Sequence, residues 1–129
     1  MVQAHAWPPR NAARPLKLYI GNRSYSSWSL RPWLVMRHFG FPLQEERVLL
    51  GRPDSKSRLL EISASGRVPV LVDEDLRVWD SLAIIEHLAE RFPGAAVWPA
   101  AARARSEARS VSAEMHAGFG ALRTQMPFN

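Results

Sequence analysis

Two short segments near the middle of the chain hold residues that could bind a small extended ligand. The first reads Gly66-Arg67-Val68-Pro69-Val70-Leu71, and the second, Asp80-Ser81, follows nine residues later and precedes an apolar run with helical spacing. Proline at the entrance of a strand supplies no backbone donor, so an extended ligand could lie alongside it. Asp-Ser before a helix is typical of an N-cap. We therefore expect a strand, an acidic turn, a second strand and a capped helix.

A serine-rich turn, Ser24-Tyr25-Ser26-Ser27-Trp28-Ser29, is the second candidate for chemistry. Serine hydroxyls just before a helix commonly cap it, which is the structural interpretation of this turn. Pro32 limits where the helix begins, because proline is tolerated only in the first turn, and this places the cap near Ser27 to Ser29. The residues alone leave open whether the serines only cap the helix or also serve a ligand.

The elements that must position these residues follow the order β-α-β-α-β-β-α. Apolar spacing and turn residues predict strands at 16–20 and 43–50, a hairpin turning at 73–75, and helices from about Ser27 to Phe39, from Asp54 or Ser55 to Ile62, and from Asp80 to about Phe92. The first two strands should be parallel, because a helical crossover joins them. This order suits an α/β fold with a four-stranded mixed sheet flanked by helices, the thioredoxin-like architecture.

Three regions follow from this pattern. Residues 1–15 carry three prolines and no periodicity, so we expect a flexible N-terminal tail. Residues 16–93 should form the thioredoxin-like domain, and residues 99–129 the start of an incomplete helical domain. The last region should be one amphipathic helix from Ala100 to Met126, because its apolar residues are spaced three to four apart. They are Val111, Met115, Phe119, Leu122 and Met126.

Composition excludes several classes of function. The chain has no cysteine, which excludes disulfide scaffolds, thiolate zinc sites and dithiol redox catalysis, and its four histidines lack metal-ligand spacing. It has no apolar run long enough to cross a bilayer and no secretory signal. We therefore expect a cytoplasmic protein that does not bind a membrane. The net charge is +5, and the surplus of basic residues lies in the N-terminal part of the chain, because six Lys or Arg and no acid occur up to Gln44. These bases are too sparse for a nucleic-acid-binding arm and fit a positive field around a pocket for an anionic ligand.

Residues 16 to 129 resemble the soluble glutathione S-transferases, on the strength of the strand, proline, hairpin and capped-helix module together with the serine turn. Anchored on Trp28, the turn resembles the zeta-class pattern Ser-Ser-Cys-Ser-Trp, with Tyr25 and Ser26 at the second serine and the cysteine. The resemblance implies a serine-type (zeta- or theta-like) member, in which one hydroxyl and the helix N-terminus stabilise the thiolate of glutathione.

The resemblance also implies roles for individual residues. Ser24 ranks first as the support of the thiolate, followed by Ser26 and Ser27, and Tyr19 is a rival because other classes use a tyrosine at the end of this strand. The Val68 amide and carbonyl would pair with the cysteinyl backbone, with Pro69 in the cis form.

At the two ends of the ligand, the resemblance implies further contacts. Asp80 would face the γ-glutamyl ammonium, although the family more often has glutamate there, and the Ser81 hydroxyl would take the carboxylate. Arg67 and Lys56 are candidates for the glycine carboxylate.

The function implied by the resemblance is attack of the glutathione thiolate on a small electrophile, or isomerisation of a substrate such as maleylacetoacetate through a glutathione adduct. Glutathione would be the co-substrate, with no metal, and a full-length form would be a homodimer. Family members continue well beyond this length, so we expect the chain to be truncated. The alternative is a non-catalytic binding or dimerisation module, and a weaker one is a small anion-binding protein.

Overall fold

The structure, a computed structural model, describes residues 16–21 and 27–118. Its sheet has four strands in the order β2-β1-β3-β4. They are β1 (Leu16–Ile20), β2 (Leu43–Arg47), β3 (Val70–Asp73) and β4 (Leu76–Val78). β1 pairs with β2 in parallel and with β3 antiparallel, and β3 pairs with β4 antiparallel. The predicted mixed sheet and thioredoxin-like order of elements are confirmed.

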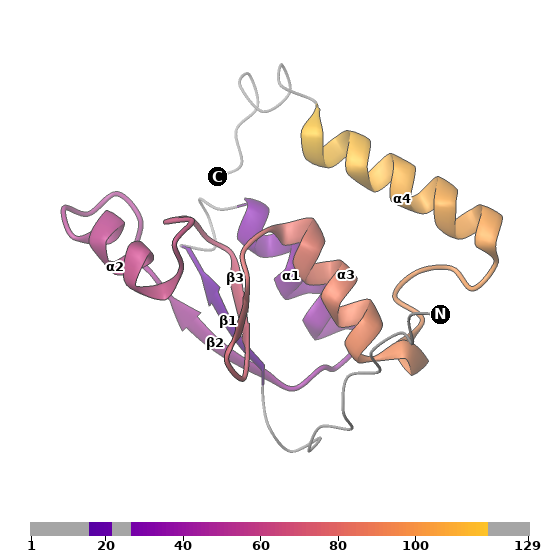
Figure 1. Cartoon of the computed structure of the whole chain (residues 1–129), viewed down its shortest axis with the longest axis horizontal. Helices are drawn as coiled ribbons and strands as arrows, with labels where there is room; N and C mark the ends of the chain where they lie inside the picture. The colour runs from indigo at the N-terminus through magenta and orange to yellow at the C-terminus, as the bar shows by residue number, and fades with distance from the viewer. Residues whose placement is uncertain (1–15, 22–26, 119–129) are drawn as a thin grey trace, which may run out of the picture.

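Helices cover both faces of the sheet. α1 (Ser27–His38) and α3 (Ser81–Arg91) lie side by side on one face, and α2 (Ser55–Ile62) lies on the other (Figure 1). Strand alternation explains the division, since β1 turns Leu16, Leu18 and Ile20 into the core beneath α1 and α3. Met36 of α1 and Ile84 and Leu88 of α3 are each fully buried against them, together with Leu71 of β3.

β2 is shorter than predicted. The expected strand ran to Leu50, but the pairing stops at Arg47, which lies opposite Ile20, the last residue of β1. A strand of the sheet ends where its neighbour ends, because no further backbone partner is available. Val48 is still buried, and its amide donates to the Ile20 carbonyl at 2.8 Å.

The β3–β4 hairpin is joined to α3 by a buried ionic cluster. Asp73, at the end of β3, is 3% exposed, and its Oδ2 lies 2.9 Å from His87 Nε2 and 3.4 Å from Arg91 Nε. Both partners come from α3, His87 about two turns and Arg91 about three turns after its Asp80 cap. The cluster ties the end of β3 to the second half of α3.

The last helix is shorter than the sequence predicts. After a 3₁₀ turn (Pro93–Ala95), α4 runs over Ala102–Ala117 rather than to Met126. Gly118 has extended backbone dihedrals, and its amide closes the helix on the Glu114 carbonyl at 2.8 Å, so the predicted helix is not continuous through this glycine. Phe119, Leu122 and Met126 lie outside the described residues. None of the described helices has both the length and the hydropathy needed to cross a bilayer.

Candidate functional site

A pocket of about 570 Å³ opens where the strand entrance meets the start of α3. Five of the residues predicted from the sequence line it: Arg67, Val68, Pro69, Asp80 and Ser81. The Val68–Pro69 peptide bond is cis, as the resemblance implied. Pairing between β3 and β1 begins only at Val70, so the residues before it lie outside the sheet ladder and beside the pocket.

The α3 N-terminus forms one wall of this pocket. Asp80 is the N-cap, with extended dihedrals, and its Oδ2 accepts a hydrogen bond from the Ala83 amide at 3.0 Å. Ser81, the first helical residue, is 2% exposed. The amides at a helix start point outward and carry partial positive charge, which suits a carboxylate or another anion. The wall therefore combines a carboxylate, a hydroxyl and the positive end of a helix at two adjacent residues.

Gly21, the last described residue before the serine turn, packs against a side chain of the pocket wall. Gly21 follows β1, and a Cβ built on it would lie 2.6 Å from Leu50 Cδ1 and 3.3 Å from Val68 Cγ2. Glycine therefore lets the end of β1 approach the strand entrance. Ser29, which is 2% exposed, accepts a hydrogen bond from the Gly21 amide at 3.2 Å. Ser29 therefore does not cap the helix as the sequence suggested, because it lies inside α1 and its hydroxyl binds the end of β1 instead.

The remaining sequence candidates are distributed as follows. Ser24 and Ser26 lie outside the described residues, and Ser27 begins α1, so the ranking of these serines stays a prediction. Tyr19 lines a different pocket with residues of α2, on the opposite face of the sheet, which disfavours it as the rival. Lys56 lies on α2, close to Gly66, and is not part of the pocket wall.

Three aromatic residues that the sequence did not assign to the site also line the pocket: Trp28, Trp79 and His116. Trp79 is 61% exposed. His116, from the last turn of α4, lies 3.0 Å from Asp80 Oδ1 through Nε2 and 3.4 Å from Ser81 Oγ through Nδ1. No local pattern could have found it, because 35 residues separate it from Ser81.

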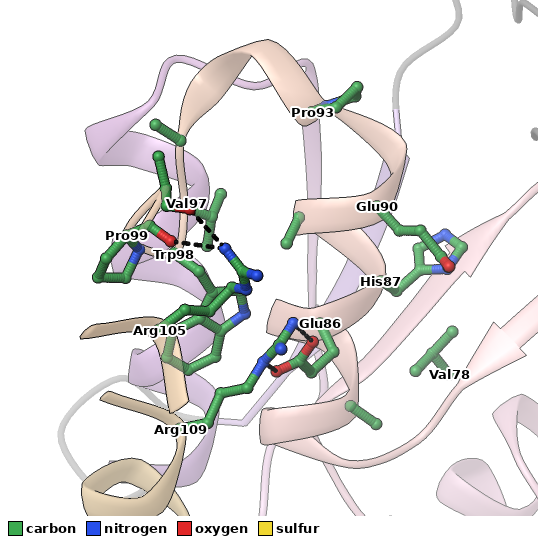
Figure 2. A pocket seen from close by; sticks show the side chains of 14 residues that line it. Val78, Glu86, His87, Glu90, Pro93, Val97, Trp98, Pro99, Arg105 and Arg109 are labelled. Carbon is green, nitrogen blue, oxygen red and sulfur yellow. Dashed lines mark hydrogen bonds and ion pairs between the residues drawn. The ribbon is translucent and has the colours of Figure 1, made fainter. Parts of the chain in front are cut away.

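A larger pocket, of about 820 Å³, lies between α3, the 3₁₀ turn and α4 (Figure 2). Its arginines are engaged with the protein itself. Arg109 makes two hydrogen bonds to the Glu86 carboxylate, at 3.1 and 3.3 Å, and Arg105 donates to the carbonyls of Pro99 and Ala100. The Arg109 pair joins α4 to α3 and the Arg105 bonds hold the loop before α4, so we interpret this region as structural and the smaller pocket as the binding site.

The comparisons with known proteins agree with this geometry. A family model described as "Glutathione S-transferase, N-terminal domain" matches residues 25–91, just over half of the chain. The chain belongs to this family. The resemblance stated from the sequence is therefore confirmed, and the matched segment includes the strand entrance and the start of α3.

Relatives and solved structures give the same family. The chain is 32% identical over 105 residues to a probable maleylacetoacetate isomerase of Caenorhabditis elegans, covering 81% of this chain and 48% of the relative. It is 37% identical over 102 residues to the maleylacetoacetate isomerase of Pseudomonas aeruginosa, covering 76% and 47%. A Burkholderia glutathione transferase homolog solved with bound glutathione superposes with a TM-score of 0.71 at 29% identity, covering 86% of this chain and 58% of that one.

This member of the glutathione S-transferase family spans about half the length of the curated relatives it matches. The family match ends at residue 91, whereas His116 lies in α4 beyond it. The pocket is thus formed partly by the matched N-terminal segment and partly by a helix that follows it.

Proposed function

We propose that this chain binds glutathione in the pocket between Val68 and Ser81 and stabilises its thiolate for reaction with a small electrophile. The observation that carries the proposal is the meeting of a cis-proline strand entrance and a capped helix start in one pocket of about 570 Å³. That volume lies within the range of about 300–1,000 Å³ typical of small-molecule sites.

The γ-glutamyl end of glutathione fits the α3 N-terminus. Its carboxylate would accept hydrogen bonds from the Ser81 hydroxyl and from amides of the first turn, and its ammonium would face Asp80. Asp80 uses Oδ2 for its cap and His116 contacts Oδ1, and each carboxylate oxygen has a second lone pair for the ammonium.

The rest of the tripeptide fits along the strand entrance. Val68 precedes the first paired residue of β3, so its amide and carbonyl are placed to pair with the cysteinyl backbone of an extended ligand. Arg67 is exposed at the rim of the pocket and would attract the glycine carboxylate. Lys56, beside Gly66, would add long-range attraction rather than a direct contact.

The cysteinyl sulfur would then reach the serine turn and the start of α1. A thiol with an ordinary pKa is mostly protonated at neutral pH, so the site must favour the thiolate. We propose that Ser24, or failing it Ser26 or Ser27, donates a hydrogen bond to the sulfur, and that the N-terminus of α1 adds about 0.3–1 kcal/mol. Each unit of pKa shift corresponds to about 1.4 kcal/mol.

Two reactions use such a thiolate. It can displace a leaving group from an electrophilic carbon and leave a conjugate, or it can add to a conjugated double bond, allow rotation about the resulting single bond, and leave again unchanged. The two relatives named as maleylacetoacetate isomerases favour the second reaction. The alternative, a non-catalytic binding or dimerisation module, remains the second candidate because the chain spans half of those relatives.

The same proposal covers partners and location. We propose a cytoplasmic protein that acts as a homodimer in its full-length form, uses no metal, and binds neither nucleic acid nor membrane. Val111 and Trp79, which are 67% and 61% exposed, offer apolar surface that a second subunit could cover.

The test compares glutathione with its two constituent dipeptides by calorimetric titration of the chain. Glutathione should bind, γ-glutamylcysteine should bind more weakly, and cysteinylglycine, which lacks the group held by α3, should lose most of the affinity. Turnover of 1-chloro-2,4-dinitrobenzene or of a cis-enone then separates an enzyme from a module. Absence of glutathione binding would overturn the proposal.

A further inference from the structure

His116 reaches from the end of α4 to the start of α3 and contacts both residues of the helix cap. Its Nε2 lies 3.0 Å from Asp80 Oδ1, and its Nδ1 lies 3.4 Å from Ser81 Oγ. The ring also meets the edge of Trp28, with centroids 5.0 Å apart. Its side chain is 26% exposed, so it is accessible from the pocket that it helps to line.

The protonation state of His116 decides which way the Ser81 hydroxyl points. Asp80 can only accept, so Nε2 must donate to it. In the neutral ring Nδ1 is then an acceptor, and the Ser81 hydrogen is directed to the ring instead of to a ligand. In the imidazolium both nitrogens donate, so Ser81 Oγ accepts from Nδ1 and its own hydrogen is released toward the pocket.

Charged groups from three parts of the fold surround the ring. Asp80 faces His116 from α3, Arg31 lies 4.2 Å from the Trp28 ring on α1, and Arg67 lines the same pocket from the strand entrance. The γ-glutamyl group would add a carboxylate at Ser81 and an ammonium at Asp80, so it brings no net charge to the ring. The link between binding and protonation is the Ser81 hydrogen, which a bound carboxylate needs and which the imidazolium does not accept.

We propose that His116 is a positioning residue of the glutathione site, which turns the Ser81 hydroxyl toward the γ-glutamyl carboxylate and takes up a proton when the ligand binds. The inference rests on the proposed function, and it assigns to α4 a part in ligand recognition that acts through Ser81 and Asp80. The doubly protonated ring donates to Asp80 and to Ser81, and it places one positive charge between the ligand carboxylate and the Asp80 carboxylate.

The measurable consequence is a pH dependence of the ligand affinity that arises from a protein side chain and not from the thiol of the ligand. Histidine ordinarily changes charge near neutral pH, so uptake of a proton should weaken binding as the pH rises from 6 to 8. One proton taken up limits the slope to about tenfold per pH unit, and we expect a total loss of about three- to tenfold because the uptake is partial. This pH dependence is opposite in sign to the one expected from the glutathione thiol, because formation of the thiolate increases as the pH rises.

The experiment uses S-methylglutathione, which has no thiol to titrate, as the ligand in calorimetry of the 129-residue chain. Titrations at pH 6, 7 and 8, each in two buffers of different ionisation enthalpy, give the affinity and the number of protons taken up. We expect uptake of a substantial fraction of one proton near pH 7, and weaker binding at pH 8 than at pH 6.

Two variants assign the proton. His116→Gln keeps a neutral donor and acceptor, so it should bind as weakly at pH 6 as the parent does at pH 8 and should take up no proton. His38→Gln, which replaces an exposed histidine in the last turn of α1, should keep the pH dependence of the parent. Far-UV circular dichroism and melting temperature establish that both variants are folded.

The outcomes separate this inference from the function on which it rests. Binding of S-methylglutathione without proton uptake, or equal pH profiles for the parent and His116→Gln, would overturn the role of His116 and leave the glutathione site intact. No binding at any pH would overturn both. The proton uptake and pH dependence measured on the unmodified chain test the proposal without any variant. The proposal therefore stays falsifiable even if His116→Gln folds poorly.

Discussion

Ser81 is the side chain that the proposed glutathione site depends on most, since it is buried at the α3 N-terminus and lines the pocket. Ser81→Ala should weaken glutathione binding by about 1–3 kcal/mol, because a carboxylate would lose its donor in a partly desolvated site. Calorimetric titration measures this directly. Ser106→Ala, at an exposed position of α4, is the matched control and should leave the affinity unchanged.

A second prediction at the residue scale concerns the support of the thiolate. Ser24→Ala should raise the pKa of the bound glutathione thiol, because the hydrogen bond from the hydroxyl stabilises the thiolate much more than the neutral thiol. The thiolate absorbance of the complex near neutral pH should fall while the dissociation constant changes little. The same effect in Ser26→Ala or Ser27→Ala instead would reorder the serines. No effect in any of the three would remove the serine mechanism.

At the scale of elements, local patterns predicted most of the fold. The alternation of Leu16, Leu18 and Ile20 and the Asp80 cap are local signals, and both appear as predicted. The end of β2 depends on where β1 ends, which the sequence of β2 does not encode. The contact of His116 with the cap depends on how α4 returns over α3, so it could not be predicted from spacing.

The Asp73 cluster supports a prediction about the coupling of hairpin and helix. Asp73→Ala would remove the hydrogen bond to His87 and the ion pair with Arg91 in a buried position, so the free energy of unfolding should fall by about 1–3 kcal/mol. Urea denaturation followed by circular dichroism measures the loss. Asp75→Ala, at the exposed hairpin turn, is the control, and an equal loss in both variants would mean that the cluster does not stabilise the fold.

At the scale of the whole molecule, α4 is held to the rest by polar contacts while its large apolar residues stay exposed. None of its residues is buried, and Val111 is 67% and Met115 39% exposed. Arg109 with Glu86 (Figure 2) and His116 with Asp80 join it to α3. Exposed apolar side chains on one helix favour association with another protein surface.

Self-association through this helix is therefore expected. Sedimentation velocity of the chain at increasing concentration should show dimers or larger species, and Val111→Glu should shift the distribution toward monomer. Ala113→Glu adds the same charge two positions away on the helix and should have a smaller effect, because it removes no large apolar side chain. A monomer at all concentrations for the parent chain would contradict this interpretation of α4.

The position of the bound ligand tests the central claim most directly. In ¹H–¹⁵N spectra of the labelled chain, glutathione should perturb the amides around Val68 and Ser81 most strongly, with the serine turn next. The larger pocket between Glu86 and Arg109 should change little. Perturbations centred on that larger pocket, or no perturbation at millimolar glutathione, would contradict the assignment of the site.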